Sequence, residues 1–279
     1  MTKVKFTLRH TGYCTANRAH TLRGVPNQTI RFYATIGIIR HPEHGVIVFD
    51  TGYSNRFFEA TRQYPMKLYA QITKVFHQDG EDITSVLKRE GIEIDEVRYV
   101  LISHFHGDHT CGLRDFRNAQ FIAPKRAWND VRGKQGIAAL IKGYLSATIP
   151  DDFRDHLRLI DFEHPTEVDS ILGPMVDVFS DGSIRLMELD GHACGQMGAL
   201  LNTQPDPTFL IADAAWLEEN YTQLHLPAPL TRLIFSSWKA FVQSLQKVHA
   251  YHLAHPEVQI IPCHCEKTLR KQSPELFHD

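Results

Sequence analysis

The chain has 279 residues, a formal net charge of −2 and 22% charged residues, which are ordinary values for a globular protein. This balance provides no basic surface for nucleic acid, and no apolar run reaches the length that spans a bilayer. Residues 1–7 lack the apolar core of a signal peptide, so we expect a cytoplasmic protein with neither nucleic acid nor a membrane as a partner.

The first part of the chain alternates predicted strands with helices. β-Favouring residues predict strands over 4–14 and 30–40, and a short apolar run predicts a third over 46–50. Residues 82–91 read as a helix that ends at a glycine. The helix leads to the apolar run 97–102, which predicts a buried strand.

Between the third strand and this helix lies an aromatic-rich segment, 54–76, which includes Phe57 and Phe58. The spacing from Leu68 to Val75 is helical. The segment either forms a wall over a site or packs against the body of the protein, and both interpretations fit its composition.

The second part continues the alternation. A strand is expected at 120–123, followed by helical segments through about residue 158. The later elements are strands near 175–180, 184–190, 197–202 and 208–212, a helix from Ser237 to Ala254, and a strand over 258–261.

The heptapeptide 103–109, Ser-His-Phe-His-Gly-Asp-His, directly follows the buried strand. Residues two apart in an extended segment point the same way, so His104 and His106 can present imidazoles to one metal ion. A turn at the glycine lets Asp108 and His109 face a second position. This density of imidazole and carboxylate groups suits zinc or another borderline first-row metal. The alternative is a polar loop with surface histidines, and the position after a buried strand argues against it.

The heptapeptide resembles the His-x-His-x-Asp-His signature of the metallo-β-lactamase superfamily. In that family the later ligands follow singly: a His after a strand, an Asp at the end of another strand, and a last His. Candidates occur in that order, at His192, Asp213 and His264. Asp50, in an Asp-Thr-Gly that ends the third strand, is similar to the family's early Asp, which supports the metal shell. The resemblance covers roughly residues 30 to 265.

The resemblance implies an α/β (α+β) fold, a four-layer αββα sandwich built as a single domain over 1–279, with cap-like insertions around 54–76 and 126–160. It also implies two zinc ions per chain, with iron or manganese as possible substitutes. By position, His104, His106 and His192 would hold one metal, Asp108, His109 and His264 would hold the other, and Asp213 would bridge them.

Two such metals share a hydroxide that attacks a carbonyl, with Asp108 assisting proton transfer. Position 213 is Asp rather than Cys and only 265–279 follow the last His, which is most similar to the superfamily's lactonases and related esterases. We therefore expect a metal-dependent hydrolase that opens a small-molecule lactone or ester, with a homodimer as a possible assembly. The alternatives are a thioesterase or iron-dependent dioxygenase of the same fold, or a non-catalytic metal-binding protein.

Trp216 differs from the residue expected in the lactonases that the chain most resembles. Quorum-quenching acyl-homoserine lactonases place a Tyr three residues after the bridging Asp, where this chain has Trp216. An indole N–H donates a hydrogen bond but is not a phenolic acid, so either Tyr221 substitutes or the substrate differs. Trp216 itself fits a pocket wall and a packed core equally well. The candidate pocket residues are Phe105, Trp216, Tyr221, Phe57 and Phe58.

The five cysteines are an odd number, which argues against a disulfide framework. Four of them, Cys111, Cys194, Cys263 and Cys265, lie within two residues of a proposed ligand His. Thiolate ligation or a redox switch is one interpretation. Cys263 and Cys265 flank His264 on a predicted extended segment, where neighbouring side chains point to opposite sides. If His264 faces the metals, this alternation favours thiols that point away from them and pack as small core residues.

Overall fold

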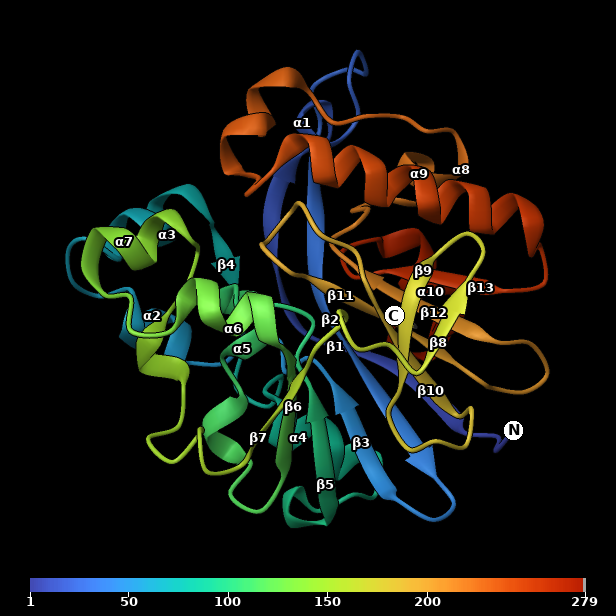
Figure 1. The fold of residues 1–279 in the computed structure, drawn as a ribbon. Coiled ribbons are helices and arrows are strands. Elements are labelled where there is room, and N and C mark those ends of the chain that lie inside the picture. Colours follow the sequence, from blue (N-terminus) through green and yellow to red (C-terminus); the bar gives the residue numbers. More distant parts are fainter. Residues whose placement is uncertain (278–279) are drawn as a thin grey trace.

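The computed structural model describes residues 1–277 and contains two β-sheets that face each other, with helices on the outer sides (Figure 1). The larger sheet has seven strands in the spatial order β4-β1-β2-β3-β5-β6-β7. Its strands are β1 (Lys5–Asn17), β2 (Thr29–His41), β3 (Gly45–Phe49), β4 (Val75–Phe76), β5 (Val97–Leu101), β6 (Gln120–Pro124) and β7 (Leu157–Ile160).

The second sheet has six strands in the order β13-β12-β11-β10-β9-β8. Its strands are β8 (Glu167–Asp169), β9 (Gly173–Asp177), β10 (Ile184–Glu188), β11 (Met197–Leu201), β12 (Thr208–Ala212) and β13 (Gln259–Pro262). All pairs in this sheet are antiparallel except β12 with β13, which run parallel.

The helices are mostly short. Among residues 1–277, no helix combines the length and the apolar character that a membrane crossing requires. The α-helices are α1 (Arg18–Thr21), α2 (Arg56–Ala60), α3 (Lys67–Ile72), α4 (Ile83–Arg89), α5 (Gly107–Thr110), α6 (Lys125–Val131), α7 (Gly136–Ile141), α8 (Glu218–Thr222), α9 (Trp238–Ala254) and α10 (Glu266–Gln272). The 3₁₀ helices are η1 (Ile94–Glu96), η2 (Leu113–Asp115), η3 (Ser146–Thr148), η4 (Pro229–Ile234) and η5 (Pro274–Phe277).

Alternating side chains join the layers. In β5, Leu101 lies in the cluster between the sheets, whereas Val100 packs outward in the cluster that contains the apolar side chains of α4. In β12, Leu210 lies between the sheets, whereas Phe209 packs in the cluster that contains the apolar side of α9. Because successive side chains of a strand point to opposite faces, each buried strand fills two cores. The predicted four-layer αββα sandwich is confirmed.

The carboxyl ends of four strands meet at one edge of the sandwich. β3 runs parallel to β5, with Phe49 opposite Leu101, and β12 runs parallel to β13, with Ala212 opposite Pro262. Parallel strands end on the same side, so the residues that follow them come together. These residues are Asp50, the heptapeptide 103–109, Asp213 and the pair 263–264.

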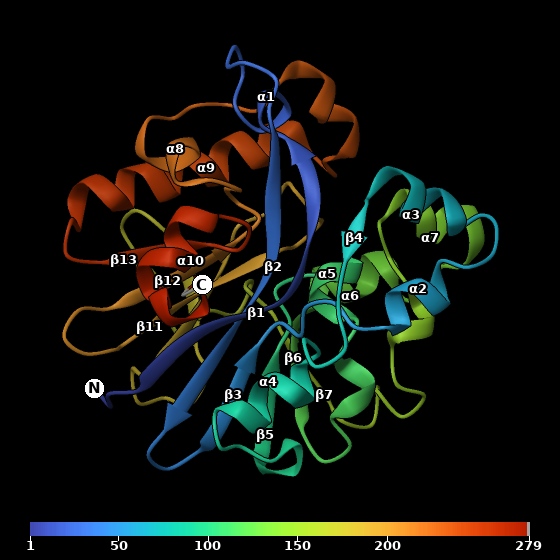
Figure 2. The ribbon, with the colours of Figure 1, turned by 180° about the vertical axis from the view of Figure 1, so that it is seen from behind.

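The two segments predicted as insertions form a lobe beside this edge. In both ribbon views α3 and α7 lie side by side, away from the sheets (Figures 1 and 2). The prediction of helical structure through about residue 158 was wrong at its end. The helical part stops at Thr148, and 157–160 is the edge strand β7, which pairs with β6. Residues 157–160 form a strand because they pair with β6. Such pairing depends on the tertiary structure and cannot be predicted from the local sequence.

Candidate metal centre

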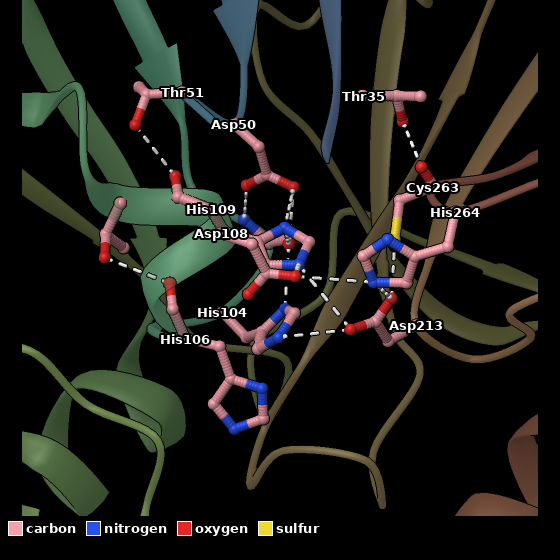
Figure 3. Close-up of polar contacts among 12 residues, drawn as sticks. Thr35, Asp50, Thr51, His104, His106, Asp108, His109, Asp213, Cys263 and His264 are labelled. Carbon is pink, nitrogen blue, oxygen red and sulfur yellow. Dashed lines mark hydrogen bonds and ion pairs between the residues drawn. The ribbon is translucent and has the colours of Figure 1, made fainter. Parts of the chain in front are cut away.

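A buried carboxylate orients the first imidazole of the site. Asp50 accepts hydrogen bonds from the Ser103 backbone N (2.8 Å), the Ser103 Oγ (2.7 Å) and the His109 Nδ1 (2.7 Å) (Figure 3). Because an ionised carboxylate only accepts, Nδ1 of His109 carries its proton and the lone pair of Nε2 points into the site.

Two further imidazoles are fixed in the same way. The Ser103 hydroxyl donates to Asp50, so it accepts from Nδ1 of His104 at 3.0 Å. Nδ1 of His264 donates to the backbone oxygen of Tyr33 at 2.8 Å. All three rings therefore turn the lone pair of Nε2 inward, which is the form that binds a metal ion.

The first group of donors surrounds one position. Nε2 of His192 lies 3.0 Å from Nδ1 of His106 and 2.9 Å from Oδ2 of Asp213. Nε2 of His104 lies 3.5 Å from the same carboxylate oxygen. Two ligands of a tetrahedral zinc ion lie about 3.3 Å apart, given bonds of about 2.0–2.1 Å. These separations are those of a coordination shell.

The second group shares the carboxylate of Asp213. Nε2 of His109 lies 3.5 Å from Oδ2 of Asp213 and 3.6 Å from Oδ2 of Asp108. Nε2 of His264 lies 3.4 Å from Oδ2 of Asp108 and 3.1 Å from Oδ1 of Asp213. The structure thus brings all seven predicted ligands together, with Asp213 between the two groups. Figure 3 shows six of them, all except His192.

Two residues with an unfavourable backbone conformation lie at or next to the carboxylates of the site. Asp50 has a φ of 58° and Ala212 has a φ of 45°, in the left-handed region that is unfavourable for residues other than glycine. Each costs of order 1–3 kcal/mol and persists only where the surroundings enforce it. Ala212 lies where the register between β12 and β13 shifts, directly before Asp213. Asp adopts this region more readily than most residues, so the strain is greater at Ala212, which directly precedes the proposed ligand Asp213.

The donor set fits divalent metal ions. Nε2 of His104 and of His109 is buried without a hydrogen-bond partner among residues 1–277. Burial lowers the pKa of His104 well below its usual value and lowers that of His106 to about 3, so both rings are neutral. Burial also lowers the pKa of His109, but the carboxylates of Asp108 and Asp50 outweigh it and raise the pKa well above its usual value. His104 and His106 therefore offer free lone pairs, whereas the carboxylates around His109 attract a cation, which is a proton in the absence of metal and a metal ion when one displaces it.

Gly191 places His192 against α9. Its φ is +127°, and a Cβ there would lie 2.0 Å from the backbone nitrogen of Phe241. We expect Gly191→Ala to destabilise the fold by at least about 3 kcal/mol and to reduce metal binding by the first group. Gly133→Ala is the control, because Gly133 also has a positive φ but open space where its Cβ would be. Thermal melts and metal content test this, and equal melting of the two variants would contradict it.

A pocket of about 200 Å³ opens beside the first group of donors. His106 and His192 form part of its wall, together with the predicted Phe105. The remaining wall comes from α6, the end of α7, the loop after His192, and the end of η4 with the residues after it. Its members are Ala127, Asp130, Val131, Ile141, Lys142, Ala193, Cys194 and 233–236. The part of the wall at η4 could not be predicted from the sequence, because the exposed apolar residues of η4 form no periodic pattern.

The other predicted pocket residues lie elsewhere. Phe57 is fully buried between Tyr53 and Tyr69, so it is a core residue rather than a wall, while Phe58 beside it is 43% exposed. Trp216 is buried behind His192, with ring centroids 5.8 Å apart. Tyr221 is also buried, and its hydroxyl donates to the backbone oxygen of Ile260 at 3.5 Å, so it does not replace the missing phenol.

The predicted direction of Cys263 was wrong. Its thiol points into the second group of donors and donates to Oδ1 of Asp213 (Figure 3). The strand β13 ends at Pro262, and the turn that follows places Cys263 and His264 on the same side. Strand alternation therefore does not apply here. Cys265 is buried in an apolar cluster, as predicted.

A third cluster, His41, His44 and Asp181, has the residue types of a metal site, but His41 has no nitrogen free to bind a metal ion. Nδ1 of His41 accepts from the backbone nitrogens of Glu43 and His44, both at 3.1 Å. Its Nε2 lies 2.9 Å from Asp181 and 3.1 Å from the Ser183 hydroxyl. Both ring nitrogens are used, so this cluster is a structural hydrogen-bond network.

Comparisons with known proteins agree with this geometry. The family model described as the metallo-beta-lactamase superfamily matches residues 30–248. Curated relatives include the N-acyl homoserine lactonase AttM of Azorhizobium caulinodans, 26% identical over 178 residues, which cover 61% of this chain and 59% of the relative. AttM of Rhizobium radiobacter is 28% identical over 194 residues, covering 68% and 67%. The match thus spans about 59% of the first relative's length.

Solved structures show the same fold. An AiiA mutant of B. thuringiensis, with N-decanoyl-L-homoserine bound at its active site, has a TM-score of 0.75, an identity of 17% and a coverage of 97% of each chain. AidC, a dizinc quorum-quenching lactonase in complex with a product, has a TM-score of 0.66 and an identity of 13%, and the match covers 95% of this chain and 89% of AidC.

Proposed function

This chain belongs to the metallo-β-lactamase superfamily, and on that premise we propose that it is a metal-dependent hydrolase that opens the ring of a small-molecule lactone or cleaves a related ester. The observation that carries the proposal is the pair of donor groups joined by Asp213, next to a pocket whose wall includes His106 and His192. A substrate in that pocket would meet the metals directly. The names of the relatives, N-acyl homoserine lactonases, support the lactone class.

We propose two zinc ions per chain, with iron or manganese as possible substitutes. His104, His106 and His192 would hold the first ion, and Asp108, His109 and His264 the second, with Asp213 shared. Neutral imidazoles with carboxylates suit a borderline metal. A dizinc relative with the same fold supports this stoichiometry.

The metals would supply Lewis acidity to the ester carbonyl and lower the pKa of water. The protein's own residues hold the substrate and move the proton. Asp108 is the more exposed of the two ligand carboxylates, with 13% of its side chain accessible against 2% for Asp213, so it can exchange a proton with substrate or solvent. The apolar part of the pocket wall, which includes Val131 and Ile141, would bind the acyl part of the substrate.

Hydrolysis of a lactone and thioester panel by metal-loaded protein tests the proposal. We expect ring opening of γ-lactones, measured as acid release, with thioesters cleaved more slowly. Matched protein stripped by a chelator should be inactive and should recover with zinc. Fully metallated protein that hydrolyses no ester, lactone or thioester would contradict the proposal, and oxygen consumption in its place would favour the dioxygenase.

Ile141 provides a test of the pocket. Ile141 and Ile137 both lie on α7 and are both exposed, at 76% and 58%, but only Ile141 lines the pocket. Ile141→Ala should lower kcat/KM about threefold to tenfold for lactones with long acyl chains, because about one to two methylene groups of contact are lost. Short-chain lactones should be unaffected, as should every substrate of the control Ile137→Ala. Equal effects of the two variants would show that this pocket does not bind the acyl chain.

A further inference from the structure

Cys263 differs in its surroundings from the cysteines that fill apolar cores. Cys14, Cys111 and Cys265 all pack within an apolar cluster. Cys263 is equally buried, at 5% exposure, but its neighbours are the polar groups of the second donor group. A buried thiol used only as a small apolar residue would not face a carboxylate and imidazoles.

The backbone fixes this orientation. The carbonyl oxygen of Cys263 accepts a hydrogen bond from the Thr35 hydroxyl at 2.7 Å, and its N–H donates to the backbone oxygen of Ala212 at 3.4 Å. Both contacts tie the turn after β13 to neighbouring strands. The thiol therefore enters the site from a rigid part of the fold, on the same side as His264 (Figure 3).

The atoms around the thiol form a metal shell. Sγ of Cys263, Nε2 of His109, Nε2 of His264 and a carboxylate oxygen of Asp213 all lie within 4.8 Å of one another. Nε2 of His109 is buried and has no hydrogen-bond partner among residues 1–277, although it faces this position. Two imidazoles, a carboxylate and a thiolate form an N/O/S set that zinc accepts in proteins.

We propose that the sulfur of Cys263 is a direct ligand of the second metal ion. This inference rests on the proposed dinuclear site and adds a ligand to it. As the sulfur–metal bond forms, the S–H bond breaks and its proton leaves to solvent. The hydrogen bond from the thiol to Asp213 is then replaced by a metal ion that both residues share. The two sites become unequal, because only the second carries a soft sulfur donor, and it should prefer zinc over harder metals.

X-ray absorption at the zinc edge tests this in the complete protein loaded with zinc. The expected result is a sulfur scatterer at about 2.3 Å, at one sulfur per two zinc ions. Cys263→Ser should lose this signal, and the control Cys265→Ser should keep it, because Cys265 lies in the apolar core. Cobalt-loaded wild-type protein should show a thiolate-to-cobalt charge-transfer band that is absent in Cys263→Ser.

The outcomes separate this inference from the proposed function. Wild-type protein with two zinc ions and only nitrogen and oxygen ligands would overturn the sulfur ligand alone. Wild-type protein that binds none of zinc, iron and manganese would overturn both. Since the decisive measurement is made on wild-type protein, it does not depend on the folding of any variant.

Discussion

Replacing Asp213 by Asn should remove both metal ions together, whereas replacing a histidine of one group should remove one. Asp213 is the carboxylate that contacts both groups: its Oδ2 lies 2.9 Å from Nε2 of His192, and its Oδ1 lies 3.1 Å from Nε2 of His264. An amide has the same shape but carries no charge and has one acceptor in place of two. It therefore cannot bridge two cations.

The measurement is metal content after equilibrium dialysis, together with lactone hydrolysis. We expect two metals in wild-type protein, one in His192→Ala and in His264→Ala, and none in Asp213→Asn. Hydrolysis by Asp213→Asn should fall by about a thousandfold or more, since losing both metals removes several kcal/mol of transition-state stabilisation. Full metal content in Asp213→Asn, or one metal in fully active wild-type protein, would show that this carboxylate does not bridge two ions.

The ligands could be predicted from the sequence because they match the order of ligands in the metallo-β-lactamase superfamily, and because several of them lie just beyond predicted strands. His104 and His106 lie three and five residues after the end of β5, Asp213 directly after β12, and His264 two residues after the end of β13. An apolar run fixes where each strand ends, so the polar residues just beyond it are placed within a residue or two. Parallel pairing then brings distant strand ends to one edge. That part of the site depends on a simple pattern.

Other features depend on contacts that no local pattern encodes. The left-handed conformation of Ala212, at the register shift before Asp213, is imposed by the pairing with β13. Cys263 faces the site because the chain turns after Pro262. Phe57 and Phe58 are adjacent and chemically identical, yet one is in the core and the other is 43% exposed. The pocket wall contributed by η4 could not be predicted either, because its position depends on packing beside His192.

Asp50→Asn should weaken the binding of the second metal without removing any of its ligands. Asp50 and His109 are both 1% exposed, and their contact at 2.7 Å holds the proton on Nδ1 of His109. Asn tolerates the left-handed backbone of this position about as well as Asp. It can keep the acceptor for the Ser103 N–H, but its NH₂ group would then face two other donors, the Ser103 hydroxyl and Nδ1 of His109. The imidazole relieves this conflict by moving its proton to Nε2, the atom that binds the metal.

Zinc affinity measured by chelator competition checks this expectation. The affinity of the second site should fall about 10- to 100-fold, in the range found when a carboxylate that supports a ligand histidine is lost. The affinity of the first site should change less, because the Ser103 hydroxyl can still orient His104. Thr51→Val is the control: the Thr51 hydroxyl donates to the backbone oxygen of His109 at 2.9 Å and does not contact the imidazole. It should affect stability more than affinity. Equal affinity losses in the two variants would mean that Asp50 acts only by holding the loop, and not by setting the proton on His109.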